Sequence, residues 1–199
     1  GFTMPFRIGP RQFIDFALHP RWSLTTLAHG RPDMANFQME GFDFDRTESR
    51  AKADWDTLRH LREIWKGRLV VKGVLNADDA KQLQLAGVDA IQVSSHGARQ
   101  LESAPAPVHA LRAIRAAVGP DMPLFYDSGL RSGEDVLKVL SEGADFAFFG
   151  RVLQFAIAAA GEAGLERLWD VLSNELSIAM AQTGRTSLDR QSNTPPERA

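Results

Sequence analysis

Residues 89–100 read Asp89-Ala90-Ile91-Gln92-Val93-Ser94-Ser95-His96-Gly97-Ala98-Arg99-Gln100. The first five residues are a short, largely apolar run, which predicts a buried strand. The polar residues that follow predict a loop at the carboxyl end of that strand. An imidazole can move a proton near neutral pH, and a guanidinium can bind a carboxylate through two hydrogen bonds. A lone histidine is more often structural, but His96 together with Arg99 favours a site for an oxyacid.

The same succession of strand and helix recurs four times after residue 50. The expected strands cover residues 69–73, 90–94, 123–126 and 145–149, and the helices that follow them cover residues 76–86, 107–118, 132–142 and 152–160. Further helices are expected over residues 52–65 and 164–183. Strands that are apolar throughout are typical of a parallel sheet buried on both faces. Four such units predict a small open α/β sheet or half of a (β/α)8 barrel, which takes about 250 residues.

The carboxyl ends of the expected strands carry the residues with chemical potential: Lys72, His96, Asp127 and Gly150-Arg151. Barrel enzymes place their active sites on that face. Open sheets also bind ligands there, so the placement leaves both folds open. A lysine at the rim of a sheet can also extend into solvent without any function.

Two glycine-containing turns lead into expected helices, over residues 127–133 and at Gly150-Arg151. Free amides at helix starts and nearby arginines bind phosphate. Either turn alone could be an ordinary connection, but two after neighbouring strands favour a phosphorylated ligand. Asp127 would repel phosphate, so we expect it to accept hydrogen bonds from a ribityl or ribose chain.

The overall composition excludes several classes of function. The chain has 199 residues, 44% of them hydrophobic, which suffices for the core of one domain. A net charge of −2 does not point to nucleic acid as a partner. The absence of cysteine excludes disulfides and thiolate chemistry, and we expect no metal. No apolar run approaches the roughly 20 residues of a membrane span. The start at Gly1 without a methionine indicates a fragment or a processed chain.

Three regions are expected: an irregular lid over residues 1–50, the sheet over 51–185 and a loose tail over 186–199. Within the first, short helices are predicted over residues 11–18 and 22–29, and a long loop over 30–50. Aromatic and basic residues alternate along residues 10–30, as in Phe13 and Trp22 beside Arg11 and Arg21. This pattern suits a membrane surface. Cover for the side of the barrel, or for a sister subunit, explains it equally well.

Four of these motifs, in this order, resemble the FMN-dependent α-hydroxy acid dehydrogenases and oxidases, which include L-lactate dehydrogenase, mandelate dehydrogenase and glycolate oxidase. The motifs are Lys72-Gly73, residues 94–101, residues 127–131 and Gly150-Arg151, and the resemblance extends over most of residues 50–185. Members of the family are (β/α)8 TIM barrels of roughly twice this length. The resemblance therefore implies that this chain is the carboxyl-terminal half of a barrel, about strands 5–8.

The resemblance also implies FMN as the cofactor and assigns roles to the motif residues. Lys72 would stabilise the reduced flavin and Ser94 would contact it. His96 would be the catalytic base, and Arg99 would hold the substrate carboxylate beside it. Asp127 would bind the ribityl chain. The phosphate would be held by Ser128, Gly129, Leu130, Arg131, Gly150 and Arg151.

The expected function is oxidation of an L-2-hydroxy acid to the 2-oxo acid. Residues 2–36 and Trp55-Asp56 resemble the L-lactate dehydrogenase branch of the family most, which implies L-lactate as the substrate. By resemblance the protein would be a tetramer, either cytoplasmic or attached to the inner membrane peripherally. The alternatives are a phosphate-binding barrel enzyme without flavin, and an inactive half-barrel that needs a partner chain.

One part of the family's active site has no counterpart here. Its earlier strands supply active-site tyrosines and the aspartate that orients the catalytic histidine, and no stretch of this sequence matches them. An unsupported histidine loses control of its tautomer. We therefore expect these 199 residues alone to be poorly stable and inactive without the missing N-terminal half of the barrel.

Overall fold

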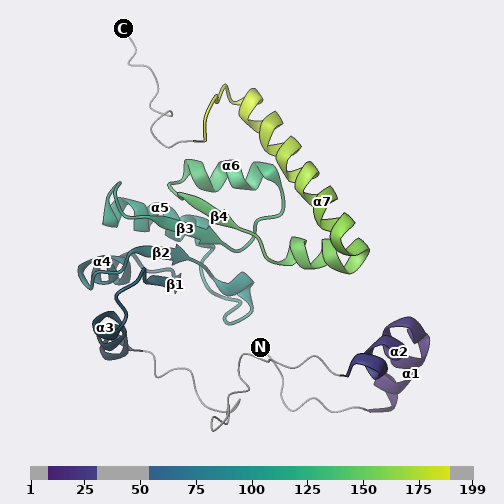
Figure 1. Cartoon of the computed structure of the whole chain (residues 1–199). Coiled ribbons are helices and arrows are strands. Elements are labelled where there is room, and N and C mark those ends of the chain that lie inside the picture. The colour runs from purple at the N-terminus through teal and green to yellow at the C-terminus, as the bar shows by residue number, and fades with distance from the viewer. Residues whose placement is uncertain (1–8, 31–53, 189–199) are drawn as a thin grey trace. The chain divides into compact units, whose positions relative to one another are not determined.

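The computed structural model describes residues 9–30 and 54–188 (Figure 1). The chain divides into two compact units, Gly1–Lys52 and Ala53–Ala199. Nearly all of the loop expected over residues 30–50, and most of the tail expected over 186–199, lie outside the described residues.

The first unit contains two short helices, α1 (Pro10–Leu18) and α2 (Pro20–His29). Each begins with a proline, whose missing amide proton costs nothing at the first helical position. This explains why α2 starts two residues before its expected start at residue 22. The rings of Phe16 and Trp22 stack with their centroids 5.5 Å apart, and the Ser23 hydroxyl donates to the Phe16 carbonyl at 2.7 Å.

The second unit alternates helices and strands along the chain. Its elements are α3 (Trp55–Ile64), β1 (Val70–Val74), α4 (Ala77–Leu85), β2 (Ala90–Val93), η3 (His96–Ala98), α5 (Pro107–Val118), β3 (Leu124–Asp127), α6 (Gly133–Ser141), β4 (Phe146–Phe148) and α7 (Arg151–Gln182). The four strands form one parallel sheet in the order β1-β2-β3-β4. The four strand–helix units that the sequence predicts are confirmed.

Side-chain caps set the helix starts in the second unit. The Asn76 side chain accepts hydrogen bonds from the first amides of α4, and the Ser132 hydroxyl accepts one from the Asp135 amide in α6. Such caps satisfy amides that have no partner within the helix. The long helix α7 leaves helical geometry at Ala160 and Gly161. That break lies between the two helices expected over residues 152–160 and 164–183.

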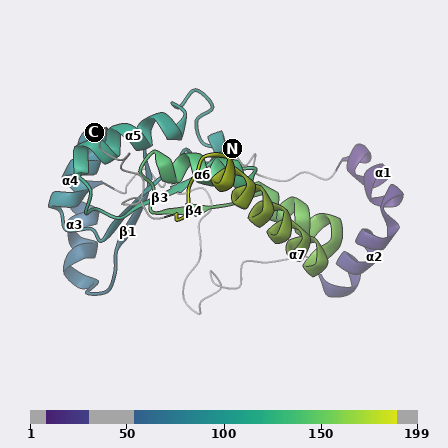
Figure 2. The same ribbon diagram turned by 90° about the horizontal axis from the view of Figure 1, so that it is seen from above.

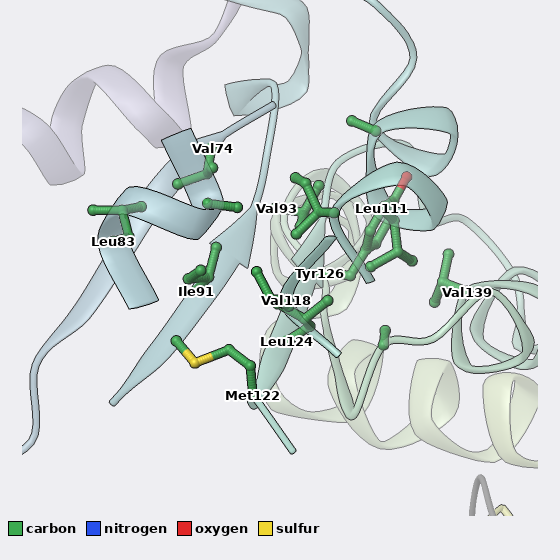
Figure 3. Packing of buried hydrophobic residues seen from close by; sticks show 14 of the residues in the cluster. Val74, Leu83, Ile91, Val93, Leu111, Val118, Met122, Leu124, Tyr126 and Val139 are labelled. Carbon is green, nitrogen blue, oxygen red and sulfur yellow. The ribbon is translucent and has the colours of Figure 1, made fainter. Parts of the chain in front are cut away.

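Helices cover one face of the sheet. α4 packs against β1 and α5, α5 against β2 and β3, and α6 against β4 and α7 (Figures 1 and 2). Figure 3 shows the resulting core, in which Ile91 and Leu124 from the strands and Leu111 from α5 are fully buried.

The opposite face, which we call the inner face, is uncovered within the described part of the chain. The strand register places Lys72, Gln92, Phe125 and Phe146 side by side on this face, because side chains alternate along strands. Phe146 is 55% exposed and Phe148 is 40% exposed. Among the described residues, the expectation of a sheet buried on both faces is therefore wrong. The helices α4, α5 and α6 pack on one side of the sheet, as helices do on the outside of a barrel wall.

Candidate active site

A network of hydrogen bonds centres on the Asp127 carboxylate at the carboxyl end of β3. Its Oδ2 atom accepts from Lys72 Nζ and from Gln92 Nε2, each at 2.5 Å. Its Oδ1 atom accepts from Ser94 Oγ at 2.5 Å and from Ser128 Oγ at 2.7 Å. Neighbouring strands and the loops after them thus direct side chains to one carboxylate.

The balance of forces on Asp127 keeps it ionised. Burial alone would raise the pKa of this carboxyl group, because a charge is poorly solvated inside a protein. The hydrogen bonds from Lys72, Ser94 and Ser128, together with the positive charge of Lys72, outweigh burial and lower the pKa of Asp127. The site therefore holds a fixed anion and a fixed cation in contact.

Ser94 connects this network to the loop of His96. Its side chain is 1% exposed, and its hydroxyl donates to Asp127. The same oxygen accepts from Lys72 Nζ at 2.8 Å and from the His96 amide at 3.1 Å. A hydroxyl has one proton and two lone pairs, so every bonding position of Ser94 is used.

The loop after β2 holds His96 in an unusual backbone conformation. His96 has a φ of 55° and Ala98 a φ of 61°, on either side of Gly97 at 66°. The imidazole lies against Gly73 of β1, where a Cβ atom would be 2.9 Å from His96 Cε1. Gly73 itself has a φ of 98°. Glycine at this position therefore provides the space that the His96 ring occupies.

The amides at the start of α6 already have protein partners. The Gly133 amide donates to Glu175 Oε2 at 2.8 Å, and the Arg131 amide donates to Asp135 Oδ2 at 3.0 Å. The start of α7 differs, because its N-cap residue is Gly150, which has no side chain to accept a hydrogen bond from the first amides of the helix. Arg151 lies toward the His96 loop, its Nη2 atom 3.7 Å from the position of a Cβ on Gly97. Of the two expected phosphate turns, the one before α6 therefore has two amides bonded within the protein, whereas the one before α7 has no side-chain cap.

The remaining predicted site residues are placed less closely together. Arg99 and Arg131 have exposed side chains on separate loops, and Gly129 has a φ of 86°. Leu130 is 8% exposed and belongs to the hydrophobic core, so its side chain is not available to a ligand.

Two residues of this region were not predicted from the sequence. Gln92 was included in an apolar strand, although it is the only polar residue of β2 and thus marks the inner face. Glu175 lies more than forty residues after the turn that it caps, at a separation for which the sequence gives no signal. Within residues 9–30 and 54–188, no group of three or more His, Asp or Glu residues is arranged to hold a metal ion.

Comparison with known proteins agrees with this arrangement. The family model described as FMN-dependent dehydrogenase matches residues 1–194. The chain belongs to the FMN-dependent dehydrogenase family. FMN is the cofactor of that family, as its description states.

Two curated relatives have similar identity to this chain. It is 36% identical to an L-lactate dehydrogenase of Bartonella tribocorum, covering 94% of this chain and 51% of that protein. It is also 36% identical to the (S)-mandelate dehydrogenase of Pseudomonas putida, covering 92% of this chain and 48% of that protein. The chain thus spans about half the length of these relatives and matches their carboxyl-terminal half.

Solved structures support the same conclusion about the fold. The crystal structure of the monotopic membrane protein (S)-mandelate dehydrogenase superposes with a TM-score of 0.82 and 34% identity, covering 94% of this chain and 51% of that one. A mandelate oxidase superposes with a TM-score of 0.65 and 38% identity over 68% of this chain and 40% of that one. The predicted part of a (β/α)8 barrel is confirmed, and the open-sheet alternative is excluded.

Proposed function

We propose that this chain provides the carboxyl-terminal half of an enzyme that oxidises an L-2-hydroxy acid, with L-lactate as substrate, to the 2-oxo acid. The observation that supports this most directly is the contact of Lys72, Ser94 and Asp127 beside His96, in a chain of this family. Family membership favours this over a phosphate-binding barrel enzyme that uses Lys72 and His96 without flavin.

On the substrate side, His96 and Arg99 would have different roles. The Arg99 guanidinium would hold the substrate carboxylate, for which its planar geometry is suited. His96 would accept the proton that leaves as the 2-hydroxy acid is oxidised. FMN would supply the acceptor for the two electrons. The fixed backbone of the loop would keep His96 in place for this proton transfer.

The side chains at the strand ends fit FMN chemically. Lys72 offers a cation for a ring that becomes negative on reduction, and the uncapped start of α7 with Arg151 offers donors for a phosphate. Asp127 already accepts four hydrogen bonds, so a ribityl hydroxyl would have to replace one of these donors. The Lys72 side chain, 43% exposed, is the donor that could turn away toward the ring.

L-Lactate is proposed as the substrate because several relatives are L-lactate dehydrogenases. The equal identity to a mandelate dehydrogenase makes mandelate the substrate to compare. The complete protein should be purified and its bound flavin identified by its yellow absorbance. Adding L-lactate or (S)-mandelate without oxygen should bleach that absorbance. A colourless protein that FMN does not reconstitute would contradict the proposal.

Replacing His96 tests the assignment of the base. His96→Gln should retain FMN but reduce the rate of flavin reduction by about 10²–10⁴-fold, the usual contribution of a general base. Arg99→Met should instead mainly weaken substrate binding. Anaerobic stopped-flow absorbance separates the two effects. Flavin reduction at the normal rate in His96→Gln would show that another group takes the proton.

The active protein would need the other half of the barrel and, by family resemblance, further copies of the complete barrel. The uncovered inner face, and the edges of β1 and β4 that no described strand pairs with, fit the other four strands of a barrel, supplied by the same polypeptide or by another chain. The family resemblance also implies that complete barrels would assemble as tetramers.

We further propose that residues 10–30 contact the cytoplasmic surface of the inner membrane. In the described chain, no helix has the length and apolar character needed to cross a bilayer. α1 and α2 nevertheless expose apolar side chains, namely Phe13, Ile14, Leu18, Trp22, Leu24 and Leu27. Arg11 and Arg21 stand among them, which suits anionic lipid headgroups. The similarity to a monotopic membrane mandelate dehydrogenase supports this proposal.

Sedimentation with vesicles tests the membrane proposal. The complete protein should sediment with vesicles that contain anionic phospholipid, and the double variant Trp22→Ser with Leu27→Ser should not. The matched variant Trp169→Ser, which alters an exposed tryptophan of α7, should sediment normally. Equal sedimentation of all three proteins would contradict a membrane role for α1 and α2.

A further inference from the structure

Backbone strain is concentrated at the candidate active site. Among the described residues, three residues other than glycine have a positive φ: His96 at 55°, Ala98 at 61° and Ser128 at 87°. A side chain in this conformation is unfavourable and persists only where surrounding contacts enforce it. His96 and Ala98 belong to the loop after β2, whereas Ser128 follows β3. Contacts between the two loops can therefore enforce the conformation of all three residues.

The Ser128 hydroxyl makes such contacts. Its oxygen accepts from the Gly97 amide at 3.0 Å and from the Ser95 amide at 3.2 Å. Its proton is donated to Asp127 Oδ1 at 2.7 Å. The single proton and both lone pairs of this hydroxyl are thus used, all within the site. The two amides flank His96 on either side.

We propose that Ser128 is a positioning residue that clamps the His96 loop to the Asp127 carboxylate. Its role in catalysis rests on the proposed function above, whereas the clamp itself does not. The family resemblance implies that Ser128 holds phosphate; the hydrogen bonds of its hydroxyl, by contrast, all go to the His96 loop and to Asp127. Asp127 would then support both sides of the site, through Lys72 on one side and through Ser128 on the other.

The positive φ of Ser128 supports a positioning role for its hydroxyl. Glycine would adopt a φ of 87° without strain. It has no side chain, however, and so could not hydrogen-bond to the His96 loop. Serine accepts the strain and contributes three hydrogen bonds. Serine at this position therefore makes its own backbone less stable and fixes the neighbouring loop.

Amide hydrogen exchange on the complete protein, without added FMN, tests the clamp. Ser128→Ala and Ser128→Gly both remove the hydroxyl, and Ser128→Gly also relieves the backbone strain. In both variants the amides of residues 95–99 should exchange about tenfold faster than in the unmodified chain, relative to amides of β2 and β3, because loop opening loses its hydrogen bonds. Ser128→Gly should have the higher Tm of the two. Ser141→Ala is the matched control, because it removes a hydroxyl bonded to the Leu137 carbonyl within α6, and it should leave exchange in residues 95–99 unchanged.

Unchanged exchange of residues 95–99 in both Ser128 variants would overturn the proposal. If Ser128→Ala does not fold, Ser128→Gly still decides, because glycine fits the backbone conformation. The exchange readout needs neither flavin nor turnover, so it stands even if the protein does not bind FMN.

A kinetic readout on the FMN-loaded complete protein separates positioning from simple structural support. Ser128→Gly should lower the rate of flavin reduction by about 10²-fold, the typical cost of misplacing a reacting group, while the Kd for FMN changes by less than about threefold. If the rate of reduction is unchanged in a protein whose loop exchanges faster, the clamp exists but does not position His96 for catalysis.

Discussion

Gln92 shares an acceptor atom with Lys72, since both side chains donate to Asp127 Oδ2. A hydrogen bond to a charged group contributes about 1.5–3 kcal/mol, so Gln92→Leu should lower the free energy of unfolding by roughly that amount. Gln92→Glu should destabilise the chain further at neutral pH, because it places a second carboxylate beside Asp127. Denaturant unfolding measures both effects.

Two comparisons check the interpretation of Gln92. Gln82→Leu, on the exposed surface of α4, should change stability by less than about 0.5 kcal/mol. The deficit of Gln92→Glu should shrink in acid, because protonating one carboxyl removes the repulsion. A deficit that does not depend on pH would indicate a steric rather than an electrostatic cause.

Tyr126 provides a direct report on the sheet core, because it is the only tyrosine in the sequence. Burial, assisted by the charges of Asp127 and Asp135, raises the pKa of Tyr126 to about 12. Its stabilising contribution is complete below the ordinary pKa of 10.0 and is lost as the pH rises toward 12. Ultraviolet absorbance of tyrosinate should therefore stay low through pH 10.0 and rise only near 12 or on unfolding. A midpoint near 10.0 in a folded chain would contradict the burial of this ring.

The positions of Lys72, His96 and Asp127 could be predicted from the sequence, whereas their contacts could not. All three are polar residues at or near the carboxyl end of an apolar strand, and parallel strands bring such ends to one edge of a sheet. The pairing of Lys72 with Asp127 depends on the register of β1 with β2 and on the register of β2 with β3. The direction of the Ser128 hydroxyl depends on a positive φ that the residue type does not indicate.

At the level of elements, the contact of α6 with α7 depends on the absence of a side chain at Gly133. A Cβ atom there would lie 2.3 Å from both the Leu172 carbonyl oxygen and the Leu176 amide nitrogen. Gly133→Ala should therefore force the two helices apart and lower the free energy of unfolding by at least about 2 kcal/mol, as in overpacked cores.

Gly150→Ala is the matched control for Gly133→Ala. Gly150 immediately precedes α7 and has a φ of −127°, and nothing lies within 4 Å of a Cβ at that position. Thermal unfolding of this variant should resemble that of the unmodified chain. Equal loss of stability in both variants would show that steric contact between α6 and α7 is not the cause.

Local signals predicted most element boundaries correctly. Asn76 and Ser132 cap the helices that the sequence assigned to them, and Gly161 marks the interruption of α7. The exposure of the strands could not be predicted in the same way. A run such as Phe146–Phe148 is apolar whether or not the other half of a barrel covers it, so composition alone indicates burial on both faces.

At the scale of the whole molecule, the inner face carries a cluster of aromatic rings that the described residues leave open. Phe125, Phe146 and Phe148 lie with their ring centroids 5.0–6.3 Å apart, and β4 has an unpaired edge beside them. Contiguous apolar surface of this kind promotes association, and free strand edges add to it. The remaining strands of the barrel would cover both features at once.

Binding of a hydrophobic dye tests whether this cluster is the surface that the other half covers. The 199-residue chain alone should bind the dye strongly, and co-expression with the amino-terminal half of a relative's barrel should abolish that binding. Phe148→Ser should weaken dye binding to the chain alone and also prevent capture of the other half. Phe155→Ser, on α7, is the matched control: although Phe155 is 68% exposed and Phe148 only 40%, it should leave capture intact, because it lies outside the ring cluster. If Phe155→Ser prevents capture and Phe148→Ser does not, the closing surface is on the helices rather than on the inner face of the sheet.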